Sequence, residues 1–249
     1  MIFFASDVHL ASDTPAITAR FLSFLERARR EAQAVYLLGD IFESWVGDED
    51  LNLKAYQSVF AALRDTTSAG VQVYFMAGNR DFMVSDQVLA SLGMIRLDDP
   101  YVLSTTTWQF VLSHGDLYCT SDIKYQEFRA KVRVPENQAK FLRLPYWLRR
   151  GIAAWIRWRS KGRRDEAQTR MITDVDEATV EDEARRFGYA TLIHGHTHRP
   201  ATHDHIVDGI HVERWVLADW STERGEYLSW DDAAETVGVE TPSLTRHSI

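Results

Sequence analysis

Residues 2–10 read IFFASDVHL, a short apolar run that passes directly into the polar residues Asp7 and His9. A run of this length, stopped by polar residues, is typical of a buried β-strand that ends in a loop. The same arrangement recurs four times, in the stretches AVYLLGD (34–40), VQVYFMAGN (71–79), QFVLSHGD (109–116) and ATLIHGHTH (190–198). The sequence therefore predicts five buried strands, each followed by Asp, Asn or His.

The segments between these strands favour helices. Residues 52–69 read as helical, and residues 15–30 carry apolar side chains at the spacing of one helical face: Ile17, Phe21, Phe24, Leu25 and Ala28. Strand, crossover helix and strand in succession is the pattern of an α/β fold.

The last part of the chain has a different pattern. Residues 203–230 alternate apolar and polar side chains around an Asp208-Gly209 turn, which predicts antiparallel hairpins. We expect a single domain over residues 1–240 and a loose tail over residues 241–249.

Charge is distributed unevenly along the chain. The net charge is −8, yet residues 124–170 hold 14 Lys and Arg against four Asp and Glu, a local charge of +10. The rest of the chain, with 14 basic and 32 acidic residues, carries −18. A basic cluster of this kind is either a solvated helical face or a surface for anions such as nucleic acid, phosphate or an anionic bilayer. The interleaved Trp147, Trp155 and Trp158 favour a binding surface.

Composition excludes several protein classes. An aromatic content of 12% is too high for a generally disordered chain. No run of 18 apolar residues is present, so no helix is expected to span a bilayer, and the first residues do not resemble a signal peptide. The single cysteine, Cys119, excludes an intrachain disulfide and indicates a cytoplasmic location.

The polar residues after the five strands are the candidate site. In open α/β sheets, ligands bind outside the carboxyl ends of the strands. Each residue alone is an ordinary turn or loop residue, but their joint placement predicts one cluster: Asp7, His9, Asp40, Asn79, His114, His196 and His198. His194, His196 and His198 occupy alternate positions, so an extended chain would present all three on one face.

This donor set points to two metal ions. Carboxylate and imidazole together suit Mn, Fe or Zn better than Ca or Mg, and the lack of thiolate weighs against a structural zinc site. Seven ligands are too many for one catalytic ion with an open position. One carboxylate that bridges two ions, about 3.5–4 Å apart, accounts for the whole set and suits in-line displacement at phosphorus.

Five ordered blocks resemble those of the calcineurin-like metallophosphoesterases: SDVHL (6–10), GDIFE (39–43), GNRD (78–81), SHGD (113–116) and HGHTH (194–198). The resemblance implies a four-layer αββα fold, a β-sandwich flanked by helices, with a helical insertion cap. It implies that one ion is held by Asp7, His9, Asp40 and His198. The other ion would be held by Asp40, Asn79, His114 and His196, with Asp40 bridging.

Arg80 departs from the commonest pattern of this family, in which a histidine follows the asparagine. A histidine can protonate a leaving alkoxide, whereas an arginine stays protonated and cannot act as a general acid. Arg80 can still bind phosphate and stabilise developing charge. A site of this kind suits a leaving group that is already a weak base, such as the phosphate of a pyrophosphate. The simpler alternative is that Arg80 only pairs with Asp81.

Residues 146–159 predict an amphipathic helix. At 100° per residue, an apolar arc that includes the three tryptophans lies opposite Arg149, Arg150 and Arg157. This composition is typical of an interfacial helix beside an anionic membrane. Packing of the arc on the core, or binding of an acyl chain by it, remain the alternatives.

Three stretches are similar to the branch of this family that acts on UDP-2,3-diacylglucosamine in bacterial lipid A biosynthesis: GNRDF (78–82), HGDLYCTSDIKYQEFRAKVR (114–133) and IHGHTHRP (193–200). The similarity implies Mn²⁺-dependent attack of water on the α-phosphorus, which releases UMP and 2,3-diacylglucosamine 1-phosphate. It also implies a peripheral position on the cytoplasmic side of the inner membrane. The implied substrate contacts are Asn79, Arg80, Asp122, Ser160, Arg164 and His196.

Within this branch, Arg164 stands where an asparagine is usual and Gln168 where a lysine is usual. A basic insert over residues 122–170 would hold the acyl chains and contact the membrane. We expect no nucleic acid and no obligate protein partner. The alternative is a nuclease or phosphodiesterase whose insert binds nucleic acid, which the −18 on the rest of the chain disfavours.

Overall fold

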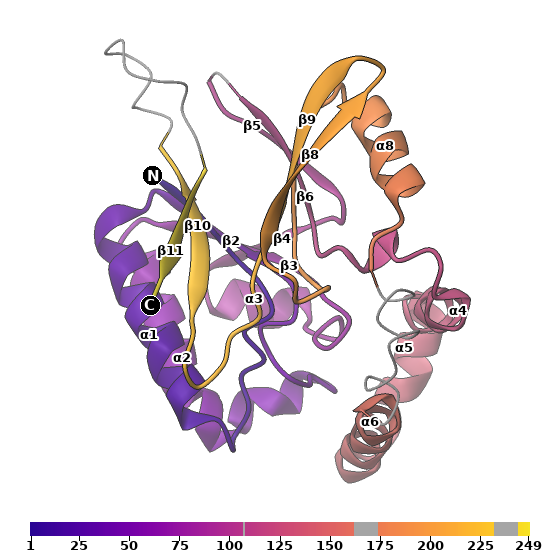
Figure 1. Cartoon of the computed structure of the whole chain (residues 1–249). Coiled ribbons are helices and arrows are strands. Elements are labelled where there is room, and N and C mark those ends of the chain that lie inside the picture. Colours follow the sequence, from indigo (N-terminus) through magenta and orange to yellow (C-terminus); the bar gives the residue numbers. More distant parts are fainter. Residues whose placement is uncertain (107, 162–173, 232–243) are drawn as a thin grey trace.

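The computed structural model describes residues 1–106, 108–161, 174–231 and 244–249, apart from the side chains of Ser160 and Lys161. Two β-sheets pack face to face (Figure 1). The six-stranded sheet has the order β11-β10-β1-β2-β3-β4, with β1 Ile2–Ala5, β2 Ala34–Leu38, β3 Gln72–Met76, β4 Met94–Leu97, β10 Glu226–Trp230 and β11 Thr245–Ser248. The five-stranded sheet has the order β5-β6-β7-β9-β8, with β5 Tyr101–Ser104, β6 Gln109–Ser113, β7 Thr191–His194, β8 Ala201–Val207 and β9 Ile210–Val216. All five strands predicted from apolar runs are confirmed as β1, β2, β3, β6 and β7.

Helices cover the outer faces of both sheets. The six-stranded sheet is covered by α1 Pro15–Glu31, α2 Gln57–Ser68 and α3 Asp86–Ser91, and the five-stranded sheet by α8 Glu177–Arg186. One apolar cluster fills the space between the first three helices and their sheet, a second lies between the sheets, and smaller ones lie under α8. The predicted four-layer αββα sandwich is therefore confirmed.

Helix α1 forms where the apolar spacing predicts it. Proline occupies its first turn, where the missing N–H costs nothing, and Arg29 and Arg30 complement the helix dipole at its end. All five residues of the predicted apolar face are buried. The helix expected over residues 52–69 is only partly correct, because residues 54–56 form a short 3₁₀ turn and α2 starts at Gln57.

The expectation of a loose C-terminal tail is wrong for its last residues. Residues 245–248 are not loose but form β11, which pairs antiparallel with β10. Arg246 holds this edge strand by an ion pair with Glu226 and by a hydrogen bond to the Val216 carbonyl oxygen, at 3.0 Å. The stretch TRHS has no apolar alternation, so its partner strand decides its conformation. The hairpin predicted around Asp208-Gly209 is confirmed, with positive φ at both turn residues.

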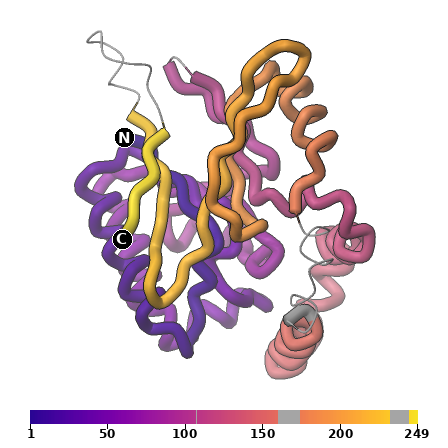
Figure 2. The backbone as a smooth tube through the Cα atoms, viewed as in Figure 1, coloured from indigo at the N-terminus to yellow at the C-terminus, as the bar shows by residue number. Residues whose placement is uncertain are grey.

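A helical insert lies at one side of the sandwich (Figure 2) and contacts it through several arginine side chains. It contains α4 Ile123–Val132, α5 Pro135–Leu142 and α6 Tyr146–Lys161, and no residue of α4 or α5 is buried. The short 3₁₀ helices η1 Asp48–Asn52, η2 Lys54–Tyr56 and η3 Asp116–Tyr118 lie in the loops of the sandwich. Throughout the described ranges, every helix is too short or too polar to cross a membrane.

Candidate active site

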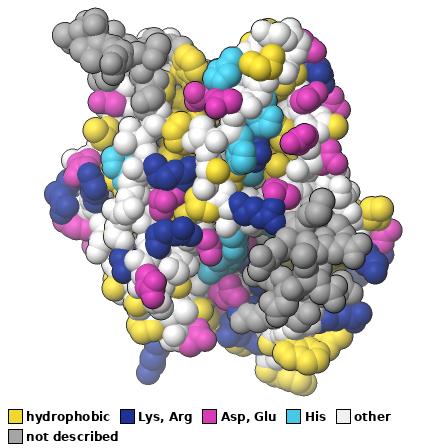
Figure 3. Space-filling model, in the orientation of Figure 1, with side chains coloured by type: hydrophobic (Ala, Val, Ile, Leu, Met, Phe, Trp, Pro, Cys, Tyr) yellow, Lys and Arg dark blue, Asp and Glu magenta, His cyan; other side chains and the backbone are white. Residues whose placement is uncertain are grey.

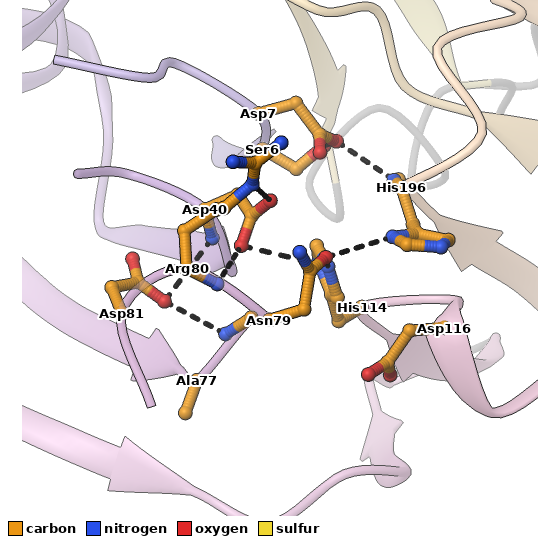
Figure 4. Close-up of polar contacts among 12 residues, drawn as sticks. Ser6, Asp7, Asp40, Ala77, Asn79, Arg80, Asp81, His114, Asp116 and His196 are labelled. Carbon is orange, nitrogen blue, oxygen red and sulfur yellow. Dashed lines mark hydrogen bonds and ion pairs between the residues drawn. The ribbon is translucent and has the colours of Figure 1, made fainter. Parts of the chain in front are cut away.

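The carboxyl ends of the predicted strands meet at one edge of the sandwich. β1, β2 and β3 are parallel neighbours in one sheet, and β6 and β7 are parallel neighbours in the other. The loops that follow them bring together all seven residues singled out by sequence: Asp7, His9, Asp40, Asn79, His114, His196 and His198. Figure 4 shows Asp7, Asp40, Asn79, His114 and His196 converging.

The backbone is strained at this point. Among the described residues, seven other than glycine have positive φ, and five of them belong to the cluster: Asp7, His9, Asp40, His196 and His198. Such conformations cost free energy and concentrate at functional sites. The sharp turns bring side chains two positions apart, Asp7 with His9 and His196 with His198, into the same cluster.

Two glycines allow the loops to approach so closely. A Cβ at Gly195 would lie 2.2 Å from Asp7 Oδ2, and one at Gly78 would lie 2.2 Å from Asp40 Oδ1. Any larger residue would displace the two carboxylates.

The first group of donors is Asp7, His9 and His198. The Nε2 atoms of the two histidines are 3.3 Å apart, and Asp7 Oδ1 lies 3.9 Å from His9 Nε2 and 3.4 Å from His198 Nε2. The other Asp7 oxygen accepts hydrogen bonds from Ser6 and from the His196 backbone N–H. These contacts leave one carboxylate oxygen and two imidazole nitrogens facing the same space.

The second group is centred on Asn79. Its Oδ1 lies 3.0 Å from His114 Nε2 and 2.9 Å from His196 Nδ1, and Asp40 Oδ1 lies 3.7 Å from the same His114 nitrogen. His114 Nδ1 donates a hydrogen bond to the Leu38 carbonyl oxygen, at 2.9 Å. Its Nε2 is therefore the ring nitrogen that faces the cluster and could bind a metal ion.

The donor chemistry fits divalent cations. Asp7 Oδ1 is buried and has no hydrogen-bond partner among the described residues, which is costly unless a cation contacts it. Burial disfavours the imidazolium of His114, but the surrounding carboxylates, Asp40 first, outweigh it and raise its pKa to about 9. Burial, together with His114, lowers the pKa of His196 to about 4. The carboxylates that favour a proton on His114 would equally favour a metal cation in its place, and binding of that cation would release the proton.

One sequence argument about histidines is wrong. His194 does not share a face with His196 and His198, because β7 ends at His194 and the following backbone turns through positive φ. Its ring instead contacts Arg214, at 3.2 Å, and burial with that arginine lowers the pKa of His194 to about 3.

Arg80 faces the cluster and does not act as a partner of Asp81. Its Nε lies 3.8 Å from Asp40 Oδ2, and its side chain is only 15% exposed. Asp81 is fully buried and accepts hydrogen bonds from the backbone N–H groups of Gly78 and Ile41, at 2.8 and 2.7 Å. The simpler alternative for Arg80 is therefore wrong in the described structure.

The proposed substrate contacts outside the cluster are only partly visible. Asp122 caps α4 by accepting from the Tyr125 N–H, at 3.0 Å. The side chain of Ser160 and the whole of Arg164 lie outside the described residues, as does Gln168.

The structure adds residues that sequence reasoning missed. Buried Asp116 anchors α4 by accepting hydrogen bonds from Arg129 Nε, at 2.8 Å, and from the Tyr125 hydroxyl, at 2.5 Å. Glu43 lies 3.0 Å from His9 Nδ1. The sequence signal that could have identified Glu43 is its place in the GDIFE block, three residues after Asp40.

Residues 1–200 match the family model described as calcineurin-like phosphoesterase. The chain belongs to the calcineurin-like phosphoesterase family. This family implies divalent metal ions, in agreement with the carboxylate and imidazole donors described above.

Within the calcineurin-like phosphoesterases, the chain is similar to several proteins named UDP-2,3-diacylglucosamine hydrolase. The protein from Chromohalobacter salexigens is 44% identical, over 92% of each chain. Those from Aromatoleum aromaticum and Escherichia coli are 41% and 42% identical, covering 95% and 88% of this chain and 95% and 91% of theirs.

Proposed function

We propose that this chain hydrolyses the pyrophosphate bond of UDP-2,3-diacylglucosamine to UMP and 2,3-diacylglucosamine 1-phosphate, a step of lipid A biosynthesis. The observation that carries the proposal is the similarity to UDP-2,3-diacylglucosamine hydrolases over nearly the whole chain, together with the family's donor cluster in place. Arg80 beside that cluster suits a pyrophosphate, whose leaving phosphate needs no proton donor.

Two divalent ions, which we take to be Mn²⁺, would supply Lewis acidity and lower the pKa of the attacking water. We assign Asp7, His9, Asp40 and His198 to one ion, and Asp40, Asn79, His114 and His196 to the other. Asp40 is the common carboxylate. The His114 ring is oriented for this by the Leu38 carbonyl oxygen, which lies 2.9 Å from Nδ1 and leaves Nε2 toward the cluster.

Arg80 would bind the transferring phosphoryl group. A guanidinium held at 3.8 Å from Asp40 can pair with phosphate oxygens through two parallel N–H groups as charge develops on them. Asn79 and His196 would contact the same phosphate, because both already point into the cluster.

The lipid part of the substrate would lie against the insert. Asp122, Ser160 and Arg164 are the proposed contacts for the glucosamine and its phosphate. Core packing of the apolar arc of α6 is wrong, because Trp147, Trp155 and Trp158 are 73%, 55% and 74% exposed. Figure 3 shows hydrophobic atoms protruding at the bottom of the molecule, where α6 lies.

We therefore propose that α6 inserts these indoles into the headgroup region on the cytoplasmic side of the inner membrane, as a peripheral contact. Nucleic acid binding is less favoured, since Arg149, Arg150 and Arg157 already pair with acidic residues of the sandwich. Part of the +10 charge is thus neutralised within the molecule.

Turnover of UDP-2,3-diacylglucosamine in detergent micelles tests the activity. We expect UMP release that requires Mn²⁺ and stops when a chelator removes it. Metal-dependent cleavage of a simple phosphodiester with no UMP release would retain the family assignment and discard the lipid substrate.

Vesicle binding tests the membrane contact. Replacing Trp147, Trp155 and Trp158 together by serine should weaken sedimentation with anionic vesicles at least about tenfold, since burial of three indoles exceeds 1.4 kcal/mol. Ile206→Ser removes an apolar side chain that is 69% exposed on β8, away from the insert, and should have no effect. Equal binding by the triple variant and the intact protein would contradict the proposal.

A further inference from the structure

Helix α6 docks on the sandwich with its arginine face. Arg149 is only 3% exposed; its Nη1 donates to the Val46 carbonyl oxygen, at 2.6 Å, and it forms an ion pair with Glu49. Arg150 and the Tyr146 hydroxyl both contact Asp50, at 3.5 and 2.6 Å. The contact surface of the sandwich is the acidic segment that follows β2 and the Asp40 loop.

The same docking face ends at an arginine that pairs with Glu43, a neighbour of the donor cluster. Arg157, two turns further along α6, forms an ion pair with Oε1 of Glu43. Arg80 Nη1 lies 3.8 Å from that same oxygen. The other oxygen, Oε2, lies 3.0 Å from His9 Nδ1. The carboxylate of Glu43 thus has the insert on one side and the donor cluster on the other.

The negative charge of Glu43, whose Oε2 lies 3.0 Å from His9 Nδ1, favours one tautomer of His9. A carboxylate at Nδ1 holds the proton on that nitrogen and directs the lone pair of Nε2 outward. His9 Nε2 is the atom that faces His198 and Asp7 in the first donor group. A carboxylate behind a metal-bound histidine typically raises the affinity for the metal by 10- to 100-fold.

We propose that Glu43 is a positioning residue that couples the docked insert to the metal ligand His9. The docked α6 holds the Glu43 carboxylate through Arg157, and Glu43 in turn orients His9. The first ion is then bound tightly only when the insert lies in place beside the site. The inference rests on the proposed role of His9 as a metal ligand.

An ordinary surface ion pair is the simpler alternative. Exposed pairs contribute little and neither partner affects a distant group. The Glu43 side chain, however, is 16% exposed and contacts two arginines and one histidine from three separate segments. Loss of such a carboxylate leaves His9 free to rotate or to change tautomer.

Calorimetric titration of the purified full chain with Mn²⁺ tests the coupling without any substrate. Glu43→Gln should weaken the first Mn²⁺ site about 10- to 100-fold. Arg157→Ala should weaken the same site in the same direction but less, and should have no further effect in the Glu43→Gln background, because both changes break one chain of contacts. Thermal unfolding of each variant verifies that it is folded.

Arg159→Ala is the matched control. It removes an arginine from the same helix, but the Arg159 guanidinium lies over the Trp155 ring and takes part in none of the docking contacts described above. We expect unchanged Mn²⁺ affinity. Unchanged affinity in Glu43→Gln would overturn the inference, and a loss in Glu43→Gln without one in Arg157→Ala would overturn the coupling to the insert. Absence of Mn²⁺ binding by the intact protein would instead overturn the proposed metal site.

Discussion

Asp40→Ala should abolish turnover, with kcat/KM lower by at least about 10³-fold, the scale of losing one preorganised electrostatic group. Asp40 is 2% exposed, and its Oδ1 accepts from the Arg80 N–H, at 2.8 Å, while facing His114. It is the only carboxylate assigned to both proposed ions. The substitution therefore removes a ligand from each ion at once.

Two measurements are needed for Asp40. UMP release reports the reaction, and equilibrium dialysis with Mn²⁺ reports the stoichiometry, which should fall below two ions per chain. Asp182→Ala serves as the control, because Asp182 is an exposed acidic residue on α8 with the same charge. Retention of two bound ions by Asp40→Ala would contradict the bridging assignment.

Arg80→Met should lower kcat about 10²- to 10³-fold and leave the Mn²⁺ stoichiometry unchanged. The methionine keeps an unbranched side chain but removes the charge near the transferring phosphoryl group. The backbone N–H of residue 80, which donates to Asp40, is retained. Arg80→Lys should recover part of the loss, since lysine retains the charge but not the planar pair of N–H groups.

Steady-state kinetics of UMP release distinguishes this role from a structural one. Arg27→Met changes an exposed arginine that pairs with Glu31 on α1, far from the site, and should leave kcat unchanged. Full kcat in Arg80→Met would show that the guanidinium does not stabilise the transition state. A loss of bound Mn²⁺ would assign Arg80 to the assembly of the metal site.

Local sequence patterns predicted the helices and strands well wherever burial of one face requires a regular spacing of apolar residues. The five residues of the α1 face are all buried, and the β8–β9 turn lies at Asp208-Gly209 as expected. The pattern failed where a strand is polar and takes its conformation from a neighbour, as β11 does beside β10. It also failed at His194, because alternation holds only while the strand continues.

Local sequence patterns were enough to identify the residues that cluster at the strand ends. Short apolar runs place Asp, Asn and His at strand ends, and parallel strands end at one edge, so the seven cluster residues follow from local information. The helical period of residues 146–159 likewise separates the tryptophans from Arg149, Arg150 and Arg157.

The surfaces that those two faces of α6 contact depend on tertiary packing. The helical period separates an apolar face of α6 from a basic face, but it does not show which of the two faces lies against the sandwich. The acidic partners Glu43, Glu49 and Asp50 stand about a hundred positions earlier in the chain, and folding alone brings them to the arginines. The paired charges lie against the sandwich and the three indoles remain outside, because the surface that α6 meets is acidic and not apolar.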